Sequence, residues 1–63
     1  MFPNVGDLWY NLVERKATGK VPSRCRVIAC IADGYDKWVV AAYDGEVPFV
    51  RSVEAWNEDF SEW

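Results

Sequence analysis

Apolar residues gather along the chain in a pattern that predicts a small β protein with one short helix. Two dense apolar runs, Cys25–Ala32 and Lys37–Tyr43, are rich in Val, Ile, Ala and aromatic residues, which favour strands. Asp33-Gly34-Tyr35-Asp36 joins them, and Gly34 tolerates the positive φ of a tight hairpin turn. The pattern therefore predicts a β-hairpin around which the rest of the chain is organised.

Shorter apolar segments on either side of this hairpin predict two more strands. The first, Val5–Val13, alternates, and its more apolar face carries Leu8, Tyr10 and Leu12. We expect that face to point inward and Trp9, which has the opposite parity, to lie at the surface. The other strand, Glu46–Arg51, contains a proline, and the missing N–H predicts an edge strand.

Two polar or mixed segments complete the secondary structure. Glu14–Lys20 predicts a seven-residue hairpin loop, with a helical turn as the alternative. After Ser52, a favourable N-cap, four residues recur at helical spacing. They predict a helix over about Val53 to Phe60 with one buried face. That face contains Val53, Trp56, Asn57 and Phe60.

The two central runs are apolar at odd and even positions alike, so both of their faces need cover. A single domain of 63 residues has little chain to provide it. We therefore expect a homodimer that contacts through a sheet face or the helix, and monomeric closure is the alternative.

Charge divides the chain into two unequal halves. Residues 1–32 carry five basic groups and two carboxylates, whereas residues 33–63 carry two basic groups and eight carboxylates. The resulting net charge of −3 disfavours general nucleic-acid binding. A local basic patch is still available for a nucleic-acid accessory role, and its residues are Arg15, Lys16, Lys20, Arg24 and Arg26.

Candidate catalytic chemistry is sparse. The chain has no His, no phosphate-binding loop and no dinucleotide fingerprint, so we expect neither an enzyme, a cofactor nor a metal site. Cys25 and Cys30 lie five apart in one predicted strand, about 16 Å from each other and on opposite faces. They should stay reduced, which favours a cytoplasmic setting, and no apolar run is long enough to span a membrane.

Three aromatic residues do not fit the predicted core: Trp9, Tyr35 and Trp63. Trp and Tyr are preferred anchors of protein interfaces, so these three predict a non-enzymatic protein-interaction module. Three acidic residues near the C-terminus, Glu58, Asp59 and Glu62, would attract a basic partner. An acidic surface that imitates nucleic acid is a further alternative.

The order of these features resembles small phage- and prophage-encoded proteins with SH3-like β-barrels. The resemblance rests on Val5-Gly6-Asp7-Leu8-Trp9, Gly19, Arg26–Ala29, Asp33-Gly34-Tyr35, Pro48-Phe49-Val50 and a tail with Val53, Trp56 and Phe60. It implies a small, strongly bent antiparallel barrel with a short C-terminal helix and no catalytic residues. Most proteins of this kind are of uncharacterised function. We expect the interaction module to be a phage accessory factor that binds and modulates a host or phage protein in an infected or lysogenic cell. An open curled sheet with the helix across one face is the alternative fold.

Overall fold

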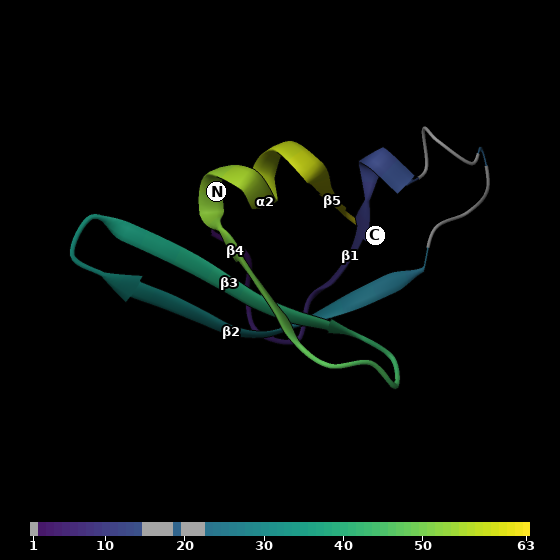
Figure 1. Ribbon diagram of the computed structural model, residues 1–63, viewed down its shortest axis with the longest axis horizontal. Coiled ribbons are helices and arrows are strands. Elements are labelled where there is room, and N and C mark those ends of the chain that lie inside the picture. Colours follow the sequence, from purple (N-terminus) through teal and green to yellow (C-terminus); the bar gives the residue numbers. More distant parts are fainter. Residues whose placement is uncertain (1, 15–18, 20–22) are drawn as a thin grey trace.

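The described part of the chain forms an antiparallel five-stranded sheet with a short helix packed on it. The structure is a computed structural model that describes residues 2–14, 19 and 23–63. Neighbouring strands follow the order β4-β3-β2-β1-β5, and the helix connects the two outermost strands (Figure 1). The elements are β1 (Leu8–Asn11), β2 (Arg24–Asp33), β3 (Asp36–Tyr43), β4 (Phe49–Ser52), α2 (Val53–Asp59) and β5 (Phe60–Glu62).

The central hairpin is formed by β2 and β3, as the sequence predicts. Asp33 pairs with Asp36 across a two-residue loop. Gly34 occupies this loop with φ of 63°, a conformation that side chains with a Cβ rarely adopt. The Asp-Gly signal is therefore confirmed by the turn that it forms.

A β-bulge in β2 changes which side chains point into the core. The register with β3 shifts between Val27 and Ala29, so Ile28 is the extra residue. Cys25 and Val27 precede the bulge and are buried, and Cys30 follows it and packs on the same core. The prediction that the two cysteines lie on opposite faces is therefore wrong, because simple alternation does not hold across a bulge. Both thiols are free.

The first strand has its faces reversed relative to the prediction. Trp9 is 3% exposed and belongs to the core, whereas Leu8 and Tyr10 are only partly buried. The strand is also shorter than expected, because residues 12–14 are helical. The Oδ1 atom of Asn11 accepts a hydrogen bond from the Glu14 backbone N–H at 3.0 Å and caps this turn. The rest of the predicted 14–20 loop, except Gly19, lies outside the described residues.

Helix α2 carries the centre of the core. Its N-cap is Ser52, whose hydroxyl accepts from the Ala55 backbone N–H at 3.2 Å, as expected. Trp56 is fully buried and stacks on Phe60, with ring centroids 4.2 Å apart and an interplanar angle of 5°. The helix ends at Asp59 with Phe60 as its C-cap, which agrees with the predicted extent of about Val53 to Phe60, and Phe60 is buried as expected. Asn57 is exposed, so its predicted place on the buried face is wrong.

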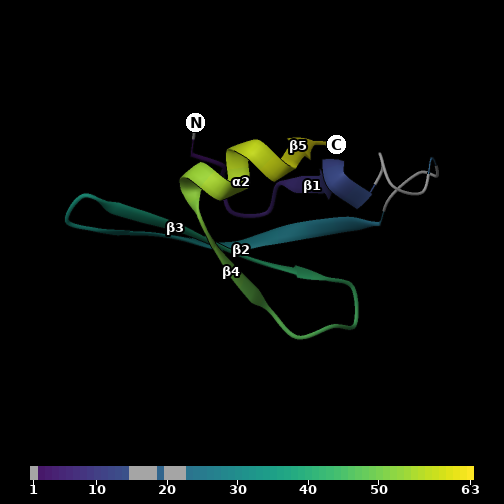
Figure 2. The ribbon, with the colours of Figure 1, turned by 45° about the horizontal axis from the view of Figure 1, so that its top comes forward.

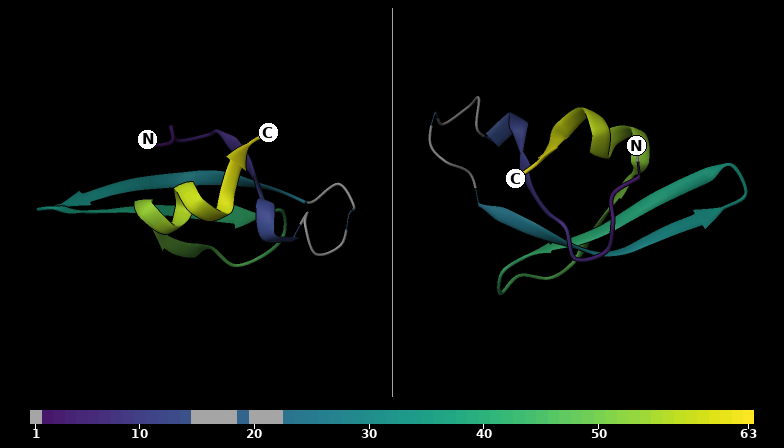
Figure 3. Two further views of the ribbon diagram at one scale, coloured as in Figure 1. Left: turned by 90° about the horizontal axis from the view of Figure 1, so that it is seen from above. Right: turned by 180° about the vertical axis from the view of Figure 1, so that it is seen from behind.

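The helix covers one face of the sheet only, which is visible when the molecule is turned (Figures 2 and 3). Trp9, Phe49 and Phe60 surround Trp56 on this covered face. We call the opposite side the outer face. The sheet does not close on itself, since β4 and β5 are its two edges. A mostly β fold with a short helix and an edge strand at β4 is therefore confirmed, and in this respect the arrangement follows the open-sheet alternative.

Candidate functional site

Among the strands that the structure describes, the end of the β2–β3 hairpin is the most exposed part. Every residue of Ile31–Trp38 is exposed, and this segment projects beyond the rest of the sheet (Figures 1 and 3). We call it the hairpin arm. It has this position because the paired register of β2 and β3 continues to the turn, whereas α2 packs further back along the sheet.

Three large apolar side chains of the hairpin arm are exposed to solvent. Ile31 and Trp38 are direct cross-strand partners on the outer face, 47% and 38% exposed. Tyr35, in the turn, is completely exposed, as the sequence analysis expects. Val50 of β4 extends this apolar surface through its cross-strand partner Val40. Adjacent large apolar side chains on a surface are typical of sites that bind another macromolecule.

The acidic residues Asp33 and Asp36 border the hairpin arm at its turn. They pair with each other across the loop and are both exposed. The tip therefore combines one aromatic ring with two carboxylates. Such a surface complements an apolar pocket that has basic side chains at its rim.

Trp63 belongs to a second cluster, at the opposite end of the sheet. Its ring meets Tyr10 edge to face at a centroid distance of 5.9 Å, and the Arg24 guanidinium lies 5.0 Å from the ring centroid. Tyr10 and Arg24 are cross-strand partners, so β1 and β2 fix their relative positions. We call these three residues the Trp63 cluster. The cluster thus contains Trp63, which was predicted to bind a protein, and Arg24, which belongs to the predicted basic patch.

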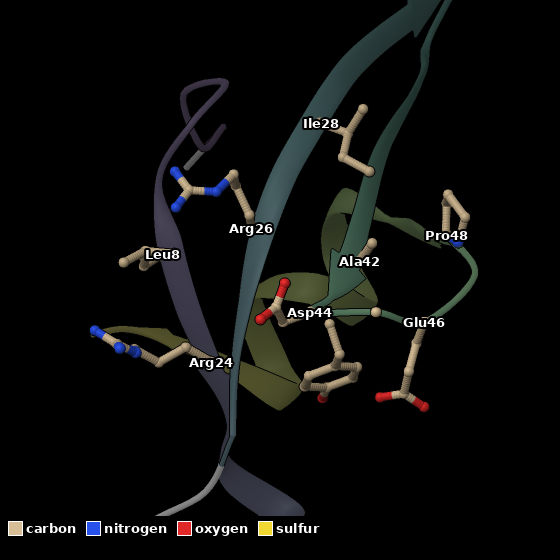
Figure 4. Close-up of a pocket in the computed structure, with 10 residues that line it drawn as sticks. Leu8, Arg24, Arg26, Ile28, Ala42, Asp44, Glu46 and Pro48 are labelled. Carbon is tan, nitrogen blue, oxygen red and sulfur yellow. The ribbon is translucent and has the colours of Figure 1, made fainter.

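A groove of about 530 Å³ lies on the outer face between β1 and the turn that follows β3 (Figure 4). Arg24 and Arg26 stand on one side of it, and Asp44 and Glu46 stand on the other. Apolar or small residues form the remainder of the lining, and they include Leu8, Ile28, Ala42 and Pro48. The groove therefore has oppositely charged walls and an apolar floor.

The predicted protein-binding residues do not form one surface. Trp9 is inside the core, so its predicted surface position is wrong: β1 turns it toward Trp56, at a ring-centroid distance of 5.4 Å. The hairpin arm holds Tyr35, whereas Trp63 lies with Tyr10 and Arg24. The acidic residues Glu58 and Asp59 are the last two residues of α2. Glu62 lies in β5, where it is the cross-strand partner of Trp9 in β1.

The predicted basic patch is only partly described. Arg24 and Arg26 are exposed on β2, and Arg26 donates a hydrogen bond to the Gly6 carbonyl oxygen at 3.2 Å. The other three members, Arg15, Lys16 and Lys20, lie outside the described residues. Ile31 and Trp38 were not among the residues predicted to bind a partner. Their signal was present in the apolar character of both strand faces, but alternation alone did not show which face stays uncovered.

The two thiols lie in apolar surroundings that keep them protonated. Burial raises the pKa of the Cys25 thiol, and its Sγ donates to the Trp9 carbonyl oxygen at 3.6 Å. Burial, and secondarily the negative charge of Asp7, raise the pKa of Cys30, whose Sγ donates to the Pro3 carbonyl oxygen at 2.9 Å. A raised pKa lowers the thiolate fraction, so both cysteines are poor nucleophiles at neutral pH.

Metal-binding groups are not assembled in the part of the chain that the structure describes. No three Cys, Asp or Glu side chains there are arranged to hold a metal ion. Within the same residues, none of the helices has the length and apolar character needed to cross a bilayer. The candidate surfaces are thus the hairpin arm, the Trp63 cluster and the groove.

Comparison of the chain with known proteins assigns no role to these three surfaces. The functional inference therefore rests on their chemistry. No family model, no curated protein and no solved structure matches the chain.

Proposed function

We propose that this protein is a non-enzymatic interaction module that binds another protein through the hairpin arm. The observation that carries the proposal is the uninterrupted exposure of Ile31–Trp38, with Ile31, Tyr35 and Trp38 all in contact with solvent. Aromatic side chains supply large contact areas at interfaces with few rotatable bonds. A rigid hairpin presents these side chains without the entropy cost of ordering a loop on binding.

The chemistry of the hairpin arm defines the partner that it fits. Ile31 and Trp38 offer a flat apolar pair, and Tyr35 at the turn fits a pocket. Asp33 and Asp36 beside it favour basic residues at the rim of that pocket. We therefore propose a protein partner with an apolar cleft bordered by Lys or Arg.

The proposal is tested by capture of partner protein from a lysate of the source cells. Immobilised wild-type protein is compared with Tyr35→Ala and with the double variant Ile31→Ser/Trp38→Ser. Val47→Ser serves as the matched control, because Val47 is also exposed but lies outside the arm. We expect one protein to be recovered by the wild type and the control and lost from both arm variants. Equal recovery by all four proteins would contradict the proposal, provided that far-UV circular dichroism shows each to be folded.

We further propose that the sheet is a small SH3-like barrel opened at its seam. Three features support this: β2 pairs with β1 at one end and with β3 along its length, a bulge bends it, and α2 links the two edge strands. The phage accessory role, with a host or phage protein as partner, rests on the resemblance in hydrophobic spacing. The two free thiols support a reducing cytoplasmic environment.

The Trp63 cluster supports a second candidate function, which is binding of single-stranded nucleic acid. An exposed Trp ring beside the exposed Arg24 guanidinium offers a base a stacking surface and its phosphate a counter-charge. The test is a fluorescence titration with an unstructured oligonucleotide at several salt concentrations. Binding that weakens with salt and is lost in Trp63→Ala, but not in Trp38→Ala, would support it. An unchanged signal at low salt would eliminate it.

A further inference from the structure

The groove on the outer face has one basic wall and one acidic wall, which are at the same level along the strands. The register pairs Arg26 with Ala42 and Cys25 with Tyr43, so Arg24 is level with Asp44. The Arg24 side chain extends toward β1, whereas the Asp44 carboxylate lies beside β2 (Figure 4), and no ion pair joins the two. Within the described residues, the two walls are therefore not neutralised by an ion pair between them.

The charges of the two walls have no ionic partner within the described residues. Arg24 packs on the Trp63 ring, and Arg26 bonds to a backbone carbonyl oxygen. Asp44 and Glu46 are exposed and make no side-chain hydrogen bond or ion pair in that part of the chain. Four charged groups thus border an apolar floor, and each of them can form an ion pair with a group of opposite charge on another molecule.

We propose that the partner of this groove is a second copy of the chain, which docks face to face around a two-fold axis parallel to β2. A rotation of this kind keeps the level of each residue along the strand and exchanges the two walls. Arg24 and Arg26 of one copy then face Asp44 and Glu46 of the other, and the contact occurs twice. The interface is self-complementary, as a two-fold interface has to be.

The apolar floor of the groove is buried by the same contact. Ile28 and Ala42 of the two copies meet between the charged walls, where β-sheets pack about 10 Å apart. Removal of these side chains from water supplies the favourable free energy, and the paired walls fix the register. Ile31 and Trp38 of the hairpin arm share the outer face but are not part of the groove lining, so the dimer proposal does not rest on the proposed partner-binding function.

The inference is tested by light scattering coupled to size-exclusion chromatography over a wide concentration range. We expect the wild-type mass to rise from that of one chain, 7.3 kDa, toward twice this value as concentration increases. Arg24→Glu and Asp44→Arg each place like charges opposite each other and should raise the dissociation constant about tenfold or more. The double variant Arg24→Glu/Asp44→Arg restores opposite charges and should recover most of the wild-type affinity.

Glu58→Arg is the matched control, because it reverses a charge on α2, away from the outer face, and should leave the dissociation constant unchanged. Circular dichroism checks that every variant is folded. A constant mass of one chain at all concentrations would overturn the proposal. So would a dimer that is insensitive to both single variants, or a double variant as weak as the singles. None of these results would affect the hairpin arm, whose test uses different residues and a different readout.

Discussion

At the scale of single residues, burial leaves the indole N–H groups of two core tryptophans without a hydrogen-bond partner among the described residues. Trp9 and Trp56 place these groups inside the core. An unsatisfied buried donor costs about 1–3 kcal/mol, so the stacking of Trp56 on Phe60 and its contact with Trp9 must outweigh that cost. The core is thus held together by aromatic packing rather than by polar contacts.

Cys25 should make the protein less stable at alkaline pH. Burial raises the pKa of its thiol above the ordinary value of 9.0, so the folded state holds this proton more tightly than the unfolded state. This contribution to the free energy of unfolding is complete below the ordinary thiol pKa and is lost as pH rises through the folded pKa. We expect urea denaturation between pH 7 and pH 10 to show a decline that is less steep in Cys25→Ala. Parallel pH profiles for the two proteins would contradict this expectation.

At the scale of elements, the seven-residue helix α2 is too short to be stable by itself. Its N-terminus is fixed by the Ser52 hydroxyl, which accepts from the Ala55 backbone N–H. Its C-terminal turn contains acidic residues and no basic one, which is unfavourable for the helix dipole. The cap and the packing of Trp56 therefore have to hold the helix in place.

Removal of the cap should weaken the fold measurably. Ser52→Ala leaves the Ala55 N–H without its acceptor and should lower the free energy of unfolding by about 1 kcal/mol. Ser52→Gly should cost only a few tenths of a kcal/mol, because Gly is tolerated at an N-cap and leaves the backbone accessible to water. Ser23→Ala, at an exposed position before β2, is the control for loss of a hydroxyl. Urea denaturation measures all three, and an equal loss for Ser52→Ala and Ser23→Ala would count against the cap.

At the scale of the whole molecule, the residues that the structure describes cover the sheet on one side only. The aromatic cluster around Trp56 lies between α2 and the sheet, and the outer face carries Ile28, Ile31 and Trp38 in contact with solvent. Stability and binding are therefore assigned to opposite faces of the same strands. The hairpin arm and the groove both use the face that stability does not need.

The same substitution on the two faces should have very different consequences. Trp56→Ala empties the centre of the core and should cost about 3–5 kcal/mol, which is as much as the whole stability of a domain this small. Trp38→Ala removes a partly exposed side chain of the outer face and should cost under about 2 kcal/mol. Far-UV circular dichroism with urea denaturation compares them. A stably folded Trp56→Ala protein, or equal losses for the two variants, would contradict the view that Trp56 is the centre of the core.

Local signals in the sequence determined much of this fold. The Asp-Gly turn, the apolar runs around it and the Ser52 cap with Trp56 behind it all depend on residues close together in the chain. Such short-range patterns act through backbone preferences and side-chain periodicity, which tertiary contacts left unchanged here. The exposure of Tyr35 was predictable for the same reason, because a two-residue turn has no neighbours to bury it.

Contacts between distant segments decided the rest. The bulge at Ile28 reversed the alternation of β2, and a shift of one position exchanges the faces of every later residue. Trp9 became a core residue because Trp56, far along the chain, packs against it. Likewise, only the position of α2 determined which apolar face is covered and which remains as the hairpin arm and the groove. Alternation in a sequence defines two faces of a strand, but the partner that covers one of them is fixed only when the whole chain packs.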